Sequence, residues 1–141
     1  MRINRVSMNI AATIVASLNL CAGRGFGETM IANVPFQFQV QDRQLPAGKY
    51  FVTDASNSSA PVILLRNLST NHGIFILPQA AIAPGANRTP RMVFQCGEET
   101  CILSEIWGAT AYNGAAIMPP RHPKETDHPT LVYLTRPKNG R

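Results

Sequence analysis

Residues 34–52 read VPFQFQVQDRQLPAGKYFV, and this stretch decides the fold class. Apolar side chains alternate with proline and glutamine over its first half, at Val34, Phe36, Phe38 and Val40. A period of two predicts a half-buried strand with its apolar side chains on one face. The QDRQLPAG segment breaks the run, because proline fixes its own φ and the glycine after it accepts a positive φ. A second strand is then expected over residues 49–54.

The rest of the chain continues the same pattern. Further strands are expected at residues 62–66 and 73–77, in a cysteine-containing hairpin at 91–96 and 101–107, and finally at 130–135. Turn residues separate these runs, as in small all-β domains. We therefore predict a single antiparallel β-sandwich or partly open barrel of about seven short strands. The expected core residues are Phe36, Phe38, Val40, Tyr50, Val52, Ile63, Leu65, Ile74, Ile76, Val93, Leu103, Ile106 and Trp107.

Two longer segments carry no clear period. Residues 78–90 read as a connection rich in alanine, proline and glycine. Residues 109–128 are expected to be irregular, because Pro119, Pro120 and Pro123 oppose both a regular helix and a central strand.

The first 27 residues have the features of a secretory signal peptide. Arg2 and Arg5 precede an uncharged stretch over residues 6–22, and small residues follow. We expect cleavage between Ala22 and Glu28, which leaves residues 28–141 as one secreted or periplasmic domain without a transmembrane span. A buried amphipathic helix is an alternative, although the segment lacks a polar face. Acylation at Cys21 is a second alternative, disfavoured because Leu20 is large where lipoprotein signals need a small residue.

Loss of the leader changes the charge balance. The full chain has 13 basic and 8 acidic residues, and three of the basic ones lie before residue 28. The mature domain is therefore nearly neutral, and we expect no nucleic-acid partner.

Cys96 and Cys101 flank the four-residue loop of the predicted hairpin. Opposite positions on paired strands bring two side chains to one face, at a separation that a disulfide bridges. A redox pair of the thioredoxin type would have two intervening residues, and a zinc site would need two more ligands in a regular spacing. A structural disulfide is the favoured interpretation.

The motifs quoted above resemble a group of uncharacterised small secreted proteins common in Acidobacteria. That group opens with a Val-Pro-Phe-x-Phe strand followed by Leu-Pro-Ala-Gly-x-Tyr, as residues 34–50 do here, and the Ile102–Trp107 stretch resembles its Leu-Ser-x-Val-Trp strand. The resemblance implies an exported β-domain, and it adds nothing about chemistry because the group has no established activity. Cys96 and Cys101 stand where the group generally has other residues.

No residue pattern identifies a catalytic, cofactor-binding or metal site. The serines lie in no known nucleophile motif, and we expect no cofactor. The favoured hypothesis is an exported noncatalytic β-domain that binds or has a structural role at the cell envelope or outside the cell. Its partner is unknown, with an envelope protein or a small apolar ligand in view. The alternative is a small metal-dependent or hydrolytic enzyme that uses the loop from His122 to His128, where Glu125 and Asp127 also lie.

Overall fold

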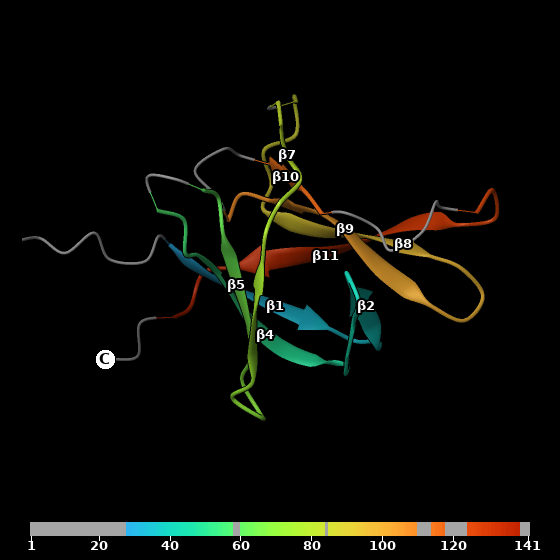
Figure 1. Cartoon of the computed structure of the whole chain (residues 1–141), viewed down its shortest axis with the longest axis horizontal. Helices are drawn as coiled ribbons and strands as arrows, with labels where there is room; N and C mark the ends of the chain where they lie inside the picture. The colour runs from blue at the N-terminus through green and yellow to red at the C-terminus, as the bar shows by residue number, and fades with distance from the viewer. Residues whose placement is uncertain (1–27, 58–59, 84, 110–113, 118–123, 139–141) are drawn as a thin grey trace, which may run out of the picture.

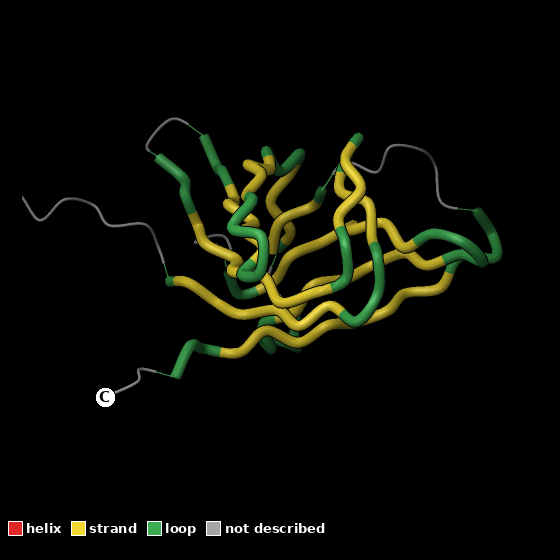
Figure 2. Tube along the Cα trace, turned by 90° about the horizontal axis from the view of Figure 1, so that it is seen from below, coloured by secondary structure: helices red, strands yellow, loops and turns green. Residues whose placement is uncertain are grey.

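The computed structural model describes residues 28–57, 60–83, 85–109, 114–117 and 124–138, and in this part of the chain it is all-β (Figures 1 and 2). The expected all-β class is confirmed, but the described residues form eleven strands instead of about seven. These strands are β1 (Thr29–Val34), β2 (Phe38–Val40), β3 (Arg43–Leu45), β4 (Gly48–Asp54), β5 (Ile63–Asn67), β6 (Gly73–Ile76), β7 (Ala80–Ile82), β8 (Arg91–Cys96), β9 (Cys101–Trp107), β10 (Gly114–Ala116) and β11 (His128–Thr135).

The strands form one continuous, curled and open sheet, so of the two expected architectures the partly open barrel is confirmed and the two-sheet sandwich is wrong (Figure 1). Their order is β3-β2-β9-β8-β11-β1-β4-β5-β6, and β10 pairs with both β9 and β7. The pairing is antiparallel except between β2 and β9, which run parallel. The sheet stays open: in the described chain β6 pairs only with β5, and β3 only with β2.

The first predicted strand is divided in two. β1 ends at Val34 and β2 begins at Phe38, because Pro35 has no amide hydrogen to continue a ladder. β1 also extends back to Thr29, where it pairs with β4 over six residue pairs. The alternation that predicted one strand therefore spans a bend between two strands with different neighbours.

Three short strands arise where no strand was expected. β3 follows β2 in a tight hairpin, β7 lies in the 78–90 connection, and β10 lies in the segment expected to be irregular. β10 reads Gly-Ala-Ala, which has no alternation, and it is held by backbone pairing with β9 on one side and β7 on the other. The final strand begins at His128 instead of residue 130.

The core lies on the inner face of the curl and centres on aromatic side chains. The ring of Phe38 contacts Tyr50 and Phe94 edge-on, with centroid distances of 5.3 Å in both cases. Phe36 adds a further edge contact to Phe94 at 5.0 Å. These contacts join β2, β4 and β8 by a geometry that aromatic quadrupoles favour.

Most of the expected core residues are buried. Phe36 and Ile74 are only partly buried, and Val93 and Trp107 are buried at 8% exposure each but lie outside the main core cluster. The Tyr50 hydroxyl donates a hydrogen bond of 2.6 Å to the Pro46 carbonyl, which fixes the Leu-Pro-Ala-Gly turn to the core. Burial raises the pKa of Tyr50 above its ordinary value of 10.0.

Candidate functional site

The face of the sheet opposite the core carries a set of apolar side chains exposed to solvent. Because strand residues alternate between faces, buried Val132 and Leu134 on β11 leave Leu131 and Tyr133 outside. Tyr133 is 56% exposed and Leu131 44%. Cross-strand neighbours extend this surface over β1, β4, β5 and β6. We call the whole set the outer patch: its exposed members are Arg66, Phe75, Leu131 and Tyr133, and its half-buried members are Ile31, Phe51 and Leu64.

The register of the strands makes the outer patch continuous. Ile31 lies opposite Phe51 on β4, and Phe51 lies opposite Arg66 on β5. Leu64 lies opposite Phe75 on β6. Direct and diagonal neighbours on one face of a sheet are close enough for their side chains to touch. The patch therefore crosses the sheet from β11 to its edge at β6.

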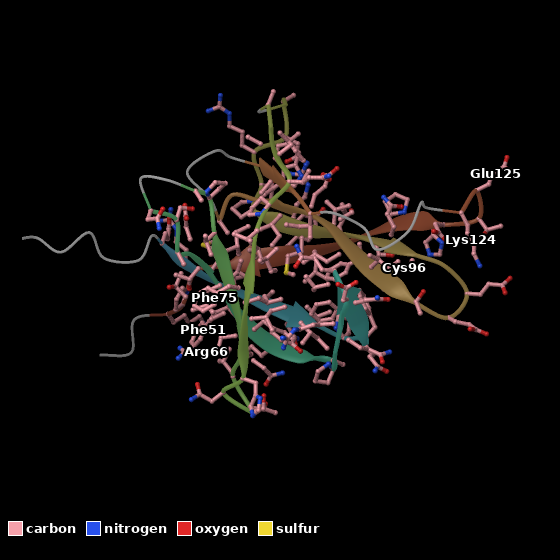
Figure 3. The ribbon with its side chains drawn as sticks, viewed as in Figure 1. Phe51, Arg66, Phe75, Cys96, Lys124 and Glu125 are labelled. Atoms are coloured by element: carbon pink, nitrogen blue, oxygen red, sulfur yellow. A yellow bond between two sulfur atoms is a disulfide. The ribbon has the colours of Figure 1, made fainter. Side chains whose placement is uncertain are left out.

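A cation lies over an aromatic ring within the outer patch. The guanidinium carbon of Arg66 is 5.3 Å from the centroid of the Phe51 ring, and both side chains lie near Phe75 (Figure 3). Phe75 is 66% exposed. The arrangement combines a large apolar area with a positive charge, which suits a partner that is apolar and weakly acidic.

Trp107 lies on the same face, but neighbouring residues cover its ring. Its indole Nε1 donates a 2.6 Å hydrogen bond to Glu105, and the guanidinium of Arg91 lies 4.7 Å from the ring centroid. Gly114 backs onto the ring, since a Cβ there would come within 2.8 Å of Trp107 Cε3. At 8% exposure Trp107 is a structural residue, as expected, although it is not in the main core.

The outer edge of the sheet at β6 is open for pairing. The amide of Asn67 donates to the carbonyl of His72 at 2.8 Å, which makes these two residues a hydrogen-bonded pair. Hydrogen-bonded and non-hydrogen-bonded pairs alternate along an antiparallel ladder. The backbone groups of Ile74 and Ile76 therefore face β5, whereas those of Gly73 and Phe75 face away from the sheet.

A groove of about 280 Å³ runs along this open edge. One wall is formed by residues 73–75 of β6 and the other by residues 40–43, the turn between β2 and β3. The edge is thus flanked by the turn and separated from it by open space.

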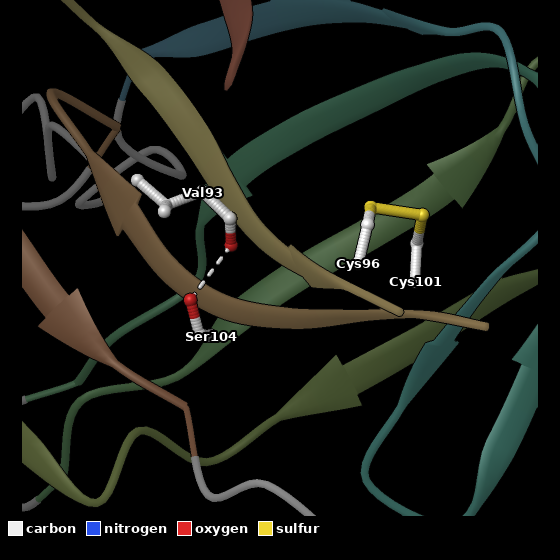
Figure 4. The surroundings of a disulfide bond; sticks show 4 residues. All are labelled: Val93, Cys96, Cys101 and Ser104. Atoms are coloured by element: carbon white, nitrogen blue, oxygen red, sulfur yellow. Dashed lines mark hydrogen bonds between the residues drawn. A yellow bond between two sulfur atoms is a disulfide. The ribbon is translucent and has the colours of Figure 1, made fainter. Parts of the chain in front are cut away.

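The cysteine hairpin connects β8 and β9, and Cys101 pairs with Phe38 of β2. The sulfur atoms of Cys96 and Cys101 are 2.10 Å apart, at disulfide distance, as expected from the sequence (Figure 4). β9 has an irregularity opposite Val93, where the Ser104 hydroxyl donates to the Val93 carbonyl at 3.0 Å. The inserted residue shifts the register by one between Val93 and Phe94, and on the hairpin side of it Cys96 and Cys101 lie directly opposite each other.

A polar groove of about 360 Å³ lies beside this hairpin, between residues 97–100 and the turn that contains Lys124 and Asp127. Asp127 accepts a hydrogen bond of 2.8 Å from the Lys124 amide, which closes that turn. Glu125 is exposed, and Lys124 and Glu125 lie far from Phe75 (Figure 3). Because the Asp127 carboxylate accepts the hydrogen bond from the Lys124 amide, it has a local structural role.

Only part of the candidate enzyme loop lies within the described residues. His122 lies outside the described residues, and His128 is exposed at the start of β11. Among the residues that are described, no three His, Cys, Asp or Glu side chains are grouped so that they could hold a metal ion.

A small apolar pocket adjoins β7 and β10. Its volume is about 70 Å³, and it is lined by residues such as Pro61, Pro78 and Ala81. Pockets for drug-sized ligands have volumes of roughly 300 Å³ or more. This pocket is too small to favour the small apolar ligand considered from the sequence.

The comparisons with known proteins gave no match among protein-family models, curated proteins or solved structures. The resemblance to secreted acidobacterial proteins therefore stays a prediction. Of the described residues, none belongs to a helix long and apolar enough to cross a lipid bilayer.

The outer patch was missed by sequence reasoning, which treated the strands as apolar on one side only. A signal was present in the run Ile74-Phe75-Ile76-Leu77, because the residues that would point to either face of a strand are all apolar. Such a run can belong to a strand covered on both faces, but here Phe75 and Leu77 are 66% and 61% exposed.

Proposed function

We propose that this chain is an exported, noncatalytic β-domain that binds an envelope protein through the outer patch. The single observation that carries the proposal is the surface formed by the exposed Phe75, Tyr133 and Leu131 and by the half-buried apolar side chains between them. Singly exposed apolar residues are ordinary, but contiguous ones that cross a sheet mark interaction surfaces. Export is supported by the basic and then apolar start of the sequence and by the cysteine pair.

A protein partner fits this surface better than a small molecule does. The outer patch is spread over β11, β1, β4, β5 and β6 and has no deep concavity at its centre, whereas small ligands occupy concave sites. Aromatic and arginine side chains, which are enriched in protein interfaces, are both present in Phe51, Tyr133 and Arg66.

The test is photo-crosslinking in cells that export the protein. A photoreactive phenylalanine analogue at Tyr133 should crosslink to a discrete envelope protein, and the same analogue at Glu98, which is exposed at the hairpin end, should not. Replacing Leu131 and Phe51 with glutamate in the Tyr133 analogue should reduce the crosslinked product by about tenfold or more, because apolar anchors at an interface each contribute on the order of 1 kcal/mol or more.

Two outcomes would contradict the proposal. Equal crosslinking from positions 133 and 98 would show that the outer patch is not a specific surface. Crosslinking only to lipid would identify a membrane surface as the partner. Export is tested separately by N-terminal sequencing of the protein from the periplasm or medium, where a start between Ala22 and Glu28 is expected and an intact Met1 would refute it.

A further inference from the structure

We propose that two copies of this chain associate by antiparallel pairing of their β6 edges. This inference concerns the strand edge and goes beyond the proposed function, which concerns the face of the sheet. It rests on the outward-facing backbone groups, on the sequence of the edge and on its charge.

The backbone of β6 is arranged for such pairing. Gly73 and Phe75 direct their N–H and C=O groups away from β5, and no described residue pairs with them. Exposed strand edges are templates for a further strand, because each unpaired backbone group gains a partner. A groove of about 280 Å³ lies between residues 73–75 and the turn at 40–43, and a second copy would have to enter beside this turn.

The side chains of β6 fit a two-fold axis through Phe75. The sequence Ile74-Phe75-Ile76 is the same when read in either direction. In an antiparallel pair centred on Phe75, each Phe75 faces its counterpart, and Ile74 of one copy faces Ile76 of the other. The Phe75 residues of the two copies would then form a hydrogen-bonded pair, which agrees with the outward direction of the Phe75 backbone groups.

The charge pattern distinguishes this edge from the opposite edge of the sheet. In a short two-fold pair the two copies of any charged edge residue lie in the same small interface, so a charged edge strand tends to repel itself. β6 and the following Leu77 contain no charged residue, whereas β3 carries Arg43 and is followed by Pro46. Charge and proline are usual means by which edge strands avoid pairing. A proline follows both strands, at Pro46 and Pro78, but only β3 itself carries a charge.

A second copy is therefore the occupant that the edge itself favours. The interface would be small, since β6 has four residues. Interfaces below about 1,200 Å² are typically weak and transient, so we expect a dissociation constant on the order of micromolar to millimolar. Phe75 belongs to both the outer patch and the edge, but Leu131 and Tyr133 lie on β11, away from the edge.

The test is sedimentation velocity of the purified protein over a wide concentration range. The wild type should shift from monomer towards dimer as the concentration rises. Phe75→Pro should remain monomeric at every concentration, because it removes an outward N–H without removing a hydrogen bond to β5. Phe75→Lys should also be monomeric. The matched control, Tyr133→Lys, adds the same charge at a similarly exposed position and should dimerise like the wild type.

A cysteine variant tests the register. Cα atoms of a hydrogen-bonded antiparallel pair lie about 5.5 Å apart, within the range of a disulfide. Phe75→Cys should therefore form a covalent dimer under mild oxidation, whereas Tyr133→Cys and the wild type should not. Thermal melting of every variant checks that it is folded.

Three results would overturn the inference. A wild type that is monomeric at all concentrations would do so, as would a dimer that persists in Phe75→Pro. A dimer lost in Tyr133→Lys but retained in Phe75→Lys would place the interface on β11. None of these results depends on the envelope crosslinks, so each proposal can fail alone.

Discussion

Removal of the Cys96–Cys101 bond should weaken the domain without unfolding it. The two cysteines are five residues apart in sequence, so the closed loop is short. In the chain-entropy description, a loop of this size restricts the unfolded state by about 2 kcal/mol at room temperature. For a domain of this length, a loss of 1 kcal/mol lowers the midpoint by about 4 °C, so reduction should lower it by about 8 °C.

The fold should survive because other contacts hold both strands of the hairpin. β8 also pairs with β11 over six residue pairs, and β9 also pairs with β2 and β10. The Gly97 amide donates to the Thr100 carbonyl at 2.9 Å, so the loop keeps a hydrogen bond of its own. Cys96 is 5% exposed in the disulfide-bonded state, so we expect its side chain to stay buried as a thiol after reduction.

Thermal unfolding followed by far-ultraviolet circular dichroism, with and without a phosphine reductant, measures the effect. Thiol titration confirms that the bond is open. The Cys96→Ala/Cys101→Ala double variant should be less stable than the reduced protein by about a further 1 kcal/mol, because it also removes a buried sulfur. It should therefore melt at a lower temperature. A reduced protein with no cooperative transition, or one with an unchanged midpoint, would refute the reasoning.

Two further substitutions test the packing. Gly114→Ala should destabilise by about 1–3 kcal/mol, because its Cβ would come within 2.8 Å of the Trp107 ring, whereas Gly85→Ala, with nothing within 4 Å, should be neutral in the same urea titration. Tyr50→Phe should cost about 1 kcal/mol at neutral pH, because the Pro46 carbonyl loses the hydroxyl's hydrogen bond of 2.6 Å. Burial raises the pKa of Tyr50 in the folded state, so the hydroxyl proton leaves the unfolded chain at a lower pH than the folded one. The free energy of unfolding should therefore fall as the pH rises above 10.0. The fall should be smaller in Tyr50→Phe, and an equal fall in both proteins would exclude Tyr50 as its cause.

The exposed edge of β6 should also affect the solubility of the protein. A strand edge without charge, in a run such as Ile74-Phe75-Ile76-Leu77, is also a site of non-native association at high concentration. If the inference is correct, Phe75→Lys should improve solubility as well as abolish dimerisation. Static light scattering of concentrated samples would record that difference.

Periodicity predicted most of the longer strands, because side-chain burial repeats every two residues wherever one face meets a core. The strands β4, β5, β6, β8 and β9 were placed within about a residue of their observed limits. Their core side chains were predicted less well, because Ile74 is only partly buried and Val93 and Trp107 lie outside the main core cluster. Met92 and Phe94 belong to that cluster and were not predicted. The cysteine pair also followed from sequence, because a hairpin loop of four residues sets two flanking positions opposite each other.

The short strands could not be predicted in the same way. β10 has only glycine and alanine, and β3 has no buried residue, so neither carries an apolar rhythm. Their backbone hydrogen bonds come from neighbours far away in the sequence, and β2 pairs with β9 across more than sixty residues. The local composition of a short strand does not predict which distant strand it pairs with.

Sequence alone therefore determined that the chain is all-β, that its apolar side chains alternate in and out, and that Cys96 and Cys101 face each other. Tertiary structure decided that the sheet curls without closing, that β6 is left at its edge, and that Phe75 and Tyr133 share one exposed face. The physical reason is that alternation assigns a side chain to one of two faces, but which face is covered, and which strand lacks a neighbour, depends on contacts between segments distant in the chain.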